Sequence, residues 1–323
     1  MSRGSLKRFK FTTYWPELTV VLLMILGTAS LAIIYGLPVQ FPAVTSLSFA
    51  GMNYLVPIGT LIGWLGLAFA VRQKQSVGYF LFAFTAYISV IILHFNVKLW
   101  MGIVNPKMWD DTYWAIDNAL RPVVDGSFAV HHGLTSIFGN IEWLYLFAFL
   151  AMFYFSFFLY ALRDGVLFRK VVLASLLVHA LGAFSYLILP AIGPFLYEAG
   201  VNGAEAIKQQ HMLSIFLAHS GPDGTGAAWI AKNGAESMFA AAAAMPSLHT
   251  ATTAVFLYFA WEYARPLTWL YVPLFLFIII EAVATRWHYI VDVPVGIVLA
   301  AICCFIAERV LQSHEIGFSP KAK

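Results

Sequence analysis

Two stretches of the sequence combine histidine with residue types that can tune its chemistry. In "AAAAMPSLHTAT", residues 241–252, Pro246 and Ser247 are typical of the start of a helix, and His249 follows within the first turn. The unpaired N–H groups of such a helix end attract anions, phosphate in particular. The stretch therefore predicts an anion site, and a simple helix cap followed by an interfacial histidine would give the same pattern.

The second stretch is "TRWHYIVDV", residues 285–293, in which His288 and Asp292 are four residues apart. This spacing predicts that they share one face of a helix, where the carboxylate can accept a hydrogen bond from the imidazole. An aspartate inside an apolar span needs such a partner. It would fix the tautomer and make the other ring nitrogen a better nucleophile or base. With Arg286 just upstream, the two stretches together predict a site that handles phosphate.

The composition places these residues in a membrane protein. Of 323 residues, 61% are hydrophobic and only 11% are charged, and the formal net charge is +3. The mean hydropathy of +0.78 lies far outside the range of soluble domains. The basic residues form short clusters between apolar runs, which argues against a nucleic-acid partner and makes membrane lipid the expected one. Cys303 and Cys304 are adjacent in an apolar run and predict neither a disulfide framework nor a metal site.

Helices of about 20 residues are needed to cross the hydrocarbon core, and this length divides the sequence into about eight spans. They are expected at 17–37, 53–72, 77–99, 141–162, 170–190, 247–264, 267–286 and 289–309. With the N-terminus in the cytoplasm, thirteen of the nineteen lysines and arginines fall inside, as the positive-inside rule favours. The other six are Lys98, Lys107, Arg121, Lys208, Lys232 and Arg286.

The same assignment puts the chemistry on the outer side. His249 begins one span and His288 lies between the last two, so both reach the outer leaflet. Two long outer segments, roughly 100–140 and 191–246, carry most of the aspartates, histidines and glycines, which indicates an outward-facing function. In the first of them, aromatic and charged residues alternate as in a helix lying in the membrane interface.

These motifs resemble the type 2 phosphatidic acid phosphatase superfamily, which also includes vanadium haloperoxidases. "PSLH" is similar to the PSGH motif of that family, with Leu248 in place of the glycine, and "RWHYIVDV" is similar to its third motif. The resemblance implies a six-helix catalytic core and a phosphohistidine mechanism. His288 would attack phosphorus, Asp292 would orient it, and His249 would protonate the leaving oxygen. Ser247, Arg286 and Arg121 would bind the substrate phosphate.

The sequence departs from the family pattern in its cations. The first motif of the family has a lysine, six residues and then Arg-Pro, and Trp114 stands at the lysine position before Arg121 and Pro122. The usual Ser-Arg before the last histidine falls at Glu281 and Ala282. "HYIVDV" and "LILPAIGPF", residues 187–195, resemble the branch of inositol phosphorylceramide and sphingomyelin synthases, which move a phospho-headgroup between lipids.

Other polar residues have simpler interpretations. Glu281 is an intramembrane acid, and we expect a hydrogen bond to a neighbouring helix, with a functional role as the alternative. His94 and His179 are expected to bond between helices, and His131 and His132 to lie exposed at the interface, where they could touch a headgroup. Asp117 and Asp125 flank Arg121 as expected ion-pair partners. No ligand spacing predicts a metal, and no cofactor is expected.

The sequence thus predicts an all-α, polytopic integral membrane helical bundle. Residues 1–100 would form N-terminal membrane helices of unassigned role, 101–311 the catalytic membrane domain, and 312–323 a cytoplasmic tail. We expect a lipid phosphotransferase in the cell (inner) membrane, with both termini cytoplasmic and the site extracytoplasmic. It would transfer a phospho group or phospho-headgroup to a hydroxylated acceptor. The alternatives are a lipid phosphate or pyrophosphate phosphatase that uses water, and a lipid transporter.

Overall fold

The computed structural model describes residues 15–43, 63, 65–66, 74–139, 141, 143–242 and 245–316. In these residues it consists of helices and connecting loops, without a strand, so the predicted all-α class is confirmed. The α-helices are α1 (Pro16–Tyr35), α4 (Lys74–Val104), α5 (Asp110–Ala119), α6 (Arg121–Phe138), α7 (Leu144–Arg163), α8 (Gly165–Ile188), α9 (Gly203–Ser220), α10 (Ala227–Ser237), α11 (Leu248–Tyr263), α12 (Arg265–Ala284) and α13 (Asp292–Ile316). Two 3₁₀ turns are η1 (Pro194–Leu196) and η2 (Met238–Ala240).

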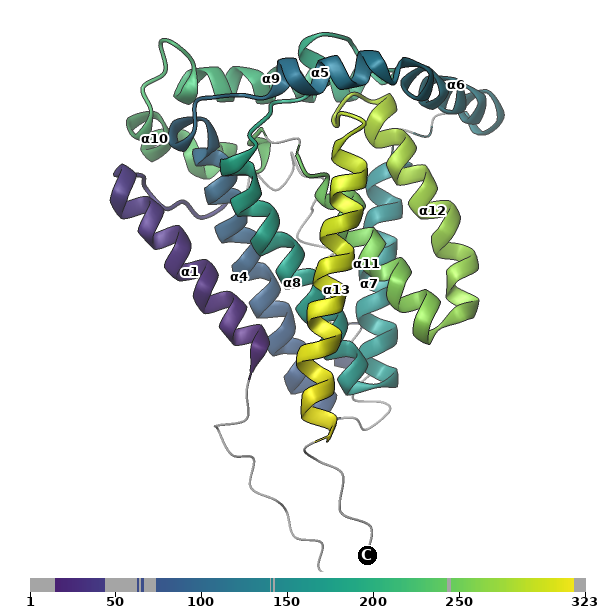
Figure 1. The fold of residues 1–323 in the computed structure, drawn as a ribbon. Coiled ribbons are helices and arrows are strands. Elements are labelled where there is room, and N and C mark those ends of the chain that lie inside the picture. The colour runs from purple at the N-terminus through teal and green to yellow at the C-terminus, as the bar shows by residue number, and fades with distance from the viewer. Residues whose placement is uncertain are drawn as a thin grey trace, which may run out of the picture.

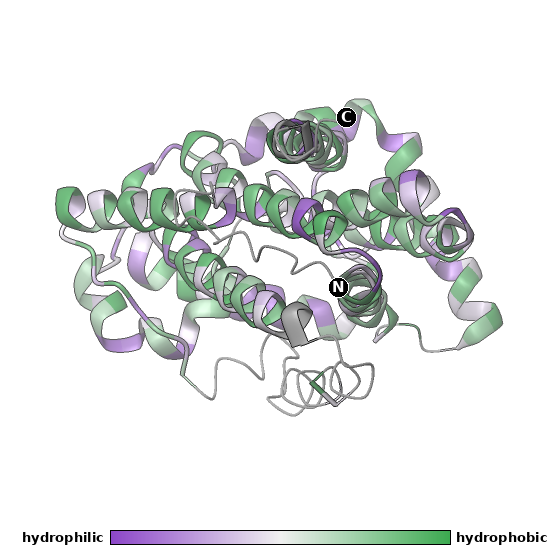
Figure 2. Cartoon of the chain, turned by 90° about the horizontal axis from the view of Figure 1, so that it is seen from below, coloured by the Kyte–Doolittle hydropathy of each residue, from purple (hydrophilic) through white to green (hydrophobic). Residues whose placement is uncertain are grey.

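The helices form an upright bundle closed at one end by helices that lie across it (Figure 1). α1, α4, α7, α8, α11, α12 and α13 run along the bundle, whereas α5, α6 and α9 cross the end at which α13 begins. Figure 2 looks along the upright helices from the opposite end, and the crossing helices extend sideways in this view. We call the end covered by α5, α6 and α9 the covered end. α5 and α6 come from the outer segment that was predicted to lie in the interface.

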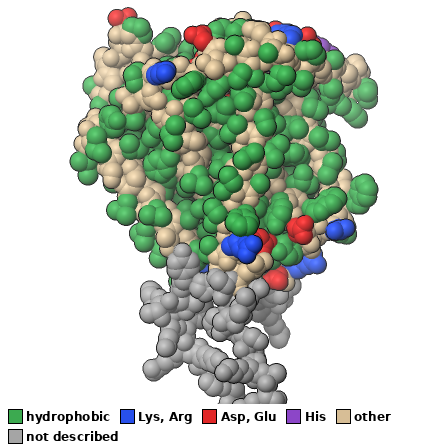
Figure 3. Space-filling model, viewed as in Figure 1, with side chains coloured by type: hydrophobic (Ala, Val, Ile, Leu, Met, Phe, Trp, Pro, Cys, Tyr) green, Lys and Arg blue, Asp and Glu red, His purple; other side chains and the backbone are tan. Residues whose placement is uncertain are grey.

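Six described helices are long and apolar enough to cross a membrane: Pro16–Tyr35, Gly78–Val104, Leu144–Arg163, Gly165–Ile188, Arg265–Ala284 and Asp292–Gln312. Hydrophobic side chains cover the side of the bundle, and charged ones gather near its two ends (Figure 3). This distribution is that of an integral membrane protein. The predicted span 247–264 is α11, whose 16 residues reach only about 24 Å and fall short of a full crossing. The predicted span 53–72 lies outside the described residues except for residues 63, 65 and 66, so the number eight stays a prediction.

Ion pairs tie the bundle together at the end opposite the covered end. Arg169 at the start of α8 forms two hydrogen bonds, of 2.8 and 2.9 Å, with the carboxylate of Glu17 in α1. Lys170 lies 3.0 Å from Glu308 in α13. α1 begins and α13 ends here, so the two ends of the described chain share one side of the bundle. The cytoplasmic location of the termini stays a prediction.

A glycine allows two helices to meet at the covered end. A Cβ atom added to Gly296, in the second turn of α13, would lie 2.6 Å from the carbonyl oxygen of Ser247, the N-cap of α11. Backbone atoms cannot move aside as a flexible side chain can. Glycine at position 296 therefore permits the close approach of α13 to the start of α11.

Replacing Gly296 with alanine should force these two helices apart. We expect a loss of about 1–3 kcal/mol in unfolding free energy, because the added methyl group meets backbone. Thermal unfolding of the purified protein in detergent measures the change. Gly133→Ala is the matched control, since Gly133 is also helical but has nothing within 4 Å of its added Cβ. It should be neutral or stabilising by about 0.5–1 kcal/mol, and equal loss in both variants would contradict the close approach.

Candidate active site

His288 and Asp292 form a buried pair in the turn between α12 and α13. The Nδ1 atom of His288 lies 3.1 Å from Oδ2 of Asp292, and the same oxygen accepts a 2.9 Å hydrogen bond from the backbone N–H of Tyr289. Asp292 has no exposed surface. A carboxylate in this position favours a proton on Nδ1 and leaves Nε2 of His288 as the basic nitrogen.

The contact arises differently from the way the spacing suggested. His288 does not lie on a helix face, because α13 begins only at Asp292. Instead, the N–H of His288 donates to Ala282 O (3.0 Å) and the N–H of Asp292 donates to Tyr289 O (3.0 Å). The chain is thereby turned so that imidazole and carboxylate meet. Asp292 is the first residue of α13, so its negative charge is also favoured by the helix N-terminus.

The start of α11 is bonded directly to this turn. Ser247 is the predicted N-cap, and its hydroxyl oxygen accepts from the N–H of Thr250 at 3.4 Å. The N–H of Ser247 donates to the carbonyl oxygen of Asp292 at 3.2 Å. His249 is half-buried, and its ring packs edge-on against Phe149 and Tyr145 of α7, with centroids 4.6 and 5.4 Å apart. The structure thus brings Ser247, His249, His288 and Asp292 together at the covered end.

Arg286 is fully buried in a cluster of its own. Its guanidinium forms an ion pair with Asp117 of α5 at 2.9 Å, lies 3.5 Å from Glu198, and stacks over the ring of Trp114 at 5.4 Å. Asp117 also accepts a 2.8 Å hydrogen bond from the N–H of Ile290. Burial raises the pKa of the Asp117 carboxyl above its usual value, and Ile290 and Arg286 oppose that rise. Trp114, which stands at the lysine position of the first family motif, thus contacts Arg286, which precedes the histidine of the third motif.

Arg121 joins the same cluster from the surface. Its guanidinium lies 2.7 Å from Asp125 and 2.8 Å from Glu198, so Glu198 contacts both arginines. Asp125 is the predicted partner of Arg121, whereas Asp117 pairs with Arg286 instead. Arg121 and Arg286 are thus both paired with carboxylates, which belong to Asp117 of α5, Asp125 of α6 and Glu198. The role of the two arginines in binding phosphate stays a prediction.

Asp110, which the sequence did not single out, fixes the loop beside the histidine turn. Its carboxylate accepts hydrogen bonds from the N–H groups of Ile192 (3.0 Å) and Gly193 (2.9 Å) and from the hydroxyl of Tyr289 (2.8 Å). Burial raises the pKa of Asp110, and these donors lower it. Gly193 has φ of 141°, a conformation that favours glycine. The only signal in the sequence was the glycine and proline of "LILPAIGPF", because the partner aspartate is about 80 residues away.

The other polar residues hold helices together. Glu281 of α12 does bond to a neighbouring helix, with an oxygen 2.9 Å from Nδ1 of His131 in α6. His131 is therefore buried and not exposed as expected, whereas His132 is exposed. Nδ1 of His94 lies 3.2 Å from the carbonyl oxygen of His179, and Nε2 of His179 lies 3.3 Å from the hydroxyl of Tyr87, so both histidines contact a neighbouring helix as expected.

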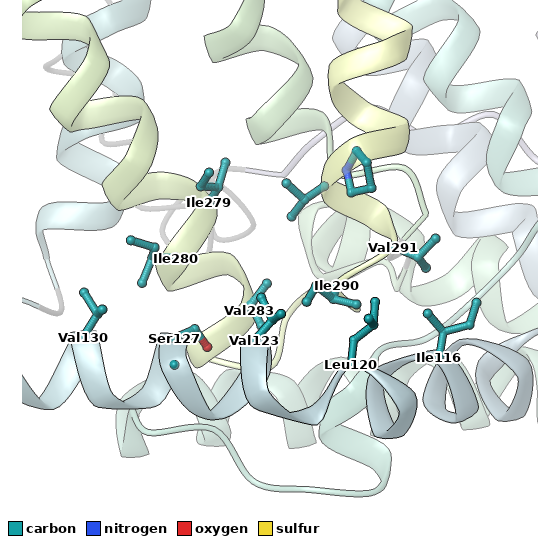
Figure 4. A pocket seen from close by; sticks show the side chains of 13 residues that line it. Ile116, Leu120, Val123, Ser127, Val130, Ile279, Ile280, Val283, Ile290 and Val291 are labelled. Atoms are coloured by element: carbon teal, nitrogen blue, oxygen red, sulfur yellow. The ribbon is translucent and has the colours of Figure 1, made fainter.

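An apolar groove opens beside the histidine turn between α6, α12 and α13 (Figure 4). Its volume is about 560 Å³. Among its lining residues are Leu120, Val123, Ile280, Val283, Ile290 and Val291. Val291 and Val293 of the lining flank Asp292 in the chain, so the groove and the pair of His288 and Asp292 share one backbone segment. A groove of this size and lining fits a hydrocarbon chain.

Removing the charge of Asp117 should destabilise the fold. In Asp117→Asn, Arg286 keeps its burial but loses its closest counter-charge, so we expect a loss of about 3 kcal/mol in unfolding free energy. Asp125→Asn is the matched control at the exposed end of the same cluster and should cost less than about 1 kcal/mol. Thermal unfolding in detergent compares the two variants, and equal effects would show that Arg286 does not depend on Asp117.

One known family matches most of this region. Residues 114–306, more than half of the chain, match the sequence model of the PAP2 superfamily. The match contains the start of α11, the histidine turn and both arginines. No curated protein and no solved structure shows a significant match to the chain. By the extent of the family match, the chain belongs to the PAP2 superfamily.

Proposed function

We propose that this member of the PAP2 superfamily is a membrane lipid phosphotransferase that works through a phosphohistidine. The observation that carries the proposal is the contact of His288 with Asp292 at 3.1 Å, joined through Ser247 to the helix that bears His249. A phosphatase or phosphotransferase acting on lipid is the general activity that family membership supports. The catalytic domain would be residues 101–311.

The first half of the reaction uses His288 as nucleophile. Its Nε2 atom attacks phosphorus, the bond from phosphorus to the leaving oxygen breaks, and His249 donates a proton to that oxygen. Asp292 holds the proton on Nδ1 and stabilises the positive charge that develops on the ring. In the second half, a hydroxyl group of the acceptor gives its proton to His249 and attacks phosphorus. The bond from nitrogen to phosphorus breaks and both histidines return to their starting state.

The apolar groove supports a lipid as the substrate. A hydrocarbon chain lying between α6 and α12 would bring its polar end toward residues 290–293, beside Asp292. The groove lies at the covered end, opposite the end where α1 begins and α13 ends. The positive-inside rule applied to the sequence, which assigns thirteen of the nineteen lysines and arginines to the cytoplasm, favours an extracytoplasmic site in the cell membrane with cytoplasmic termini.

The covering helices favour transfer over hydrolysis. α5, α6 and α9 lie across the end of the bundle that holds the histidines, and a covered phosphohistidine reacts less readily with bulk water. The motif variant "HYIVDV" supports an activity like that of the inositol phosphorylceramide and sphingomyelin synthases. A phosphatase that uses water as the acceptor requires the same residues and is the second candidate.

His288→Ala should abolish turnover while leaving the protein folded. We expect at least about a 10³-fold loss of activity, because no other group can form the covalent intermediate. Purified protein in detergent would be assayed with lipid phosphates and phosphodiesters for free phosphate and for new phospholipids. His132→Ala, at an exposed position on α6, is the control and should keep full activity. Full activity of His288→Ala would refute the mechanism, and no turnover by the unchanged protein across a broad panel would favour a transporter.

His249→Ala should slow the reaction in a manner that depends on the leaving group. A general acid contributes about 10²–10⁴-fold, and it matters most when the leaving oxygen is strongly basic. We therefore expect a large loss with an alkyl phosphate and a small one with a nitrophenyl phosphate. Measuring kcat for both substrates gives the comparison, and equal losses would show that His249 is not the acid.

A further inference from the structure

The charges around the histidine pair do not suit an anionic substrate. Asp292 contributes a negative charge next to the proposed nucleophile, and the two arginines lie in contact with Asp117, Asp125 and Glu198. A phosphate group would add at least one more negative charge. Binding of the phosphate group therefore requires a further cation that is not already paired with a carboxylate.

Lys98 of α4 lies on a side of that helix that faces the start of α11. It follows His94 by four residues, so the two side chains share one face of the helix. The ring of His94 packs against that of Tyr186 at 5.6 Å, and the hydroxyl of Tyr186 donates to the carbonyl oxygen of Pro246 at 3.5 Å. Pro246 immediately precedes Ser247. This face of α4 is thus directed toward the start of α11.

A second set of contacts gives the same placement. The Nζ atom of Lys98 lies 5.5 Å from the ring centroid of Phe95, and that ring packs edge-on against Phe239 at 4.6 Å. Phe239 belongs to η2, the turn that leads into the residues before Ser247. The charge of Lys98 acts on His249 and on His94.

Lys98 differs from Lys170 and Lys208 in its partners. Lys170 pairs with Glu308 and Lys208 pairs with Glu205, whereas Lys98 has no ion pair with any residue that the structure describes. It is nevertheless half-buried near the outer end of a membrane span. A cation in such a place is costly without a counter-charge, which is a reason to expect that an anion joins it during function.

We propose that Lys98 binds the phosphate group of the substrate beside His249. Its ammonium group donates hydrogen bonds to phosphate oxygens as a point charge and offsets the negative charge of the site. This inference rests on the proposed function for the identity of the anion. It also gives the N-terminal helices, residues 1–100, a part in the active site, because Lys98 lies before the matched range 114–306.

The test measures binding of inorganic phosphate to the full chain in detergent by ³¹P NMR titration. Lys98→Met keeps the length of the side chain and removes its charge, so the dissociation constant should rise at least about tenfold. Lys98→Arg should restore affinity to within about threefold, since a cation is regained. Lys107→Met is the control, because Lys107 also packs its ammonium group over an aromatic ring, 4.8 Å from the Trp109 centroid, but is exposed. It should bind phosphate as the unchanged protein does.

Equal phosphate affinity of the unchanged protein and Lys98→Met would overturn the proposal, as would a lack of phosphate binding by the unchanged protein. If Lys98→Met does not elute as a folded protein, Lys98→Gln is measured in its place. His288→Ala separates this inference from the proposed function, since it should bind phosphate but not turn over substrate. If His288→Ala stays active while Lys98→Met loses phosphate affinity, the mechanism fails and the phosphate site stands. If His288→Ala is inactive while Lys98→Met binds phosphate as the unchanged protein does, the mechanism stands and the role of Lys98 fails.

Discussion

The active site depends on the way one aspartate is held by both its side chain and its main chain. The carboxylate of Asp292 contacts His288 and the N–H of Tyr289, while its carbonyl oxygen accepts from the N–H of Ser247. One residue therefore sets the distance between His288, the proposed nucleophile, and the helix that carries the proposed acid. Because Asp292 also begins α13, the whole last helix fixes its position, and Gly296 lets that helix approach the cap of α11.

Carboxylates on the covering helix α5 keep the histidine turn in place. Asp110 bonds to the hydroxyl of Tyr289, and Asp117 bonds to the N–H of Ile290 and pairs with Arg286. These contacts attach α5 to both sides of His288. Helix α5 of the cover and the histidine turn are thus bonded to each other at several points. The arginine that the sequence suggested as a phosphate ligand has a clear part in this attachment, because its charge allows Asp117 to be buried.

Features that depend on local sequence were predicted well. The length of the apolar runs located most upright helices, and Pro246 and Ser247 marked the start of α11. The mixture of aromatic and charged residues located the crossing helix α5 and the start of α6, whereas α9 was not predicted. The pair of His288 and Asp292 was found from its spacing, although the structure makes the contact through a turn. Partners distant in sequence were missed. Asp110 and Tyr289 are 179 residues apart, and Glu281 and His131 are 150 apart. Nothing in the residues near Asp117 indicated that its partner would be Arg286, since Arg121 is nearer in the chain.

The choice between water and a lipid hydroxyl as acceptor depends on geometry and not on the catalytic residues. In the proposed mechanism either acceptor presents an O–H to His249 and an oxygen to phosphorus, so the same two histidines would serve both reactions. What differs is which molecule can occupy the space next to the proposed phosphohistidine. A lipid acceptor is held by burial of its hydrocarbon chain, which contributes about 0.8 kcal/mol for each buried methylene group. A groove of about 560 Å³ beside Asp292, with α6 forming both its wall and part of the cover, can therefore favour the lipid only while the cover stays in place. Water is excluded from the site only if α5 and α6 stay in place across the end of the bundle. The buried contacts of Asp110, Asp117 and Glu281 hold these two helices there.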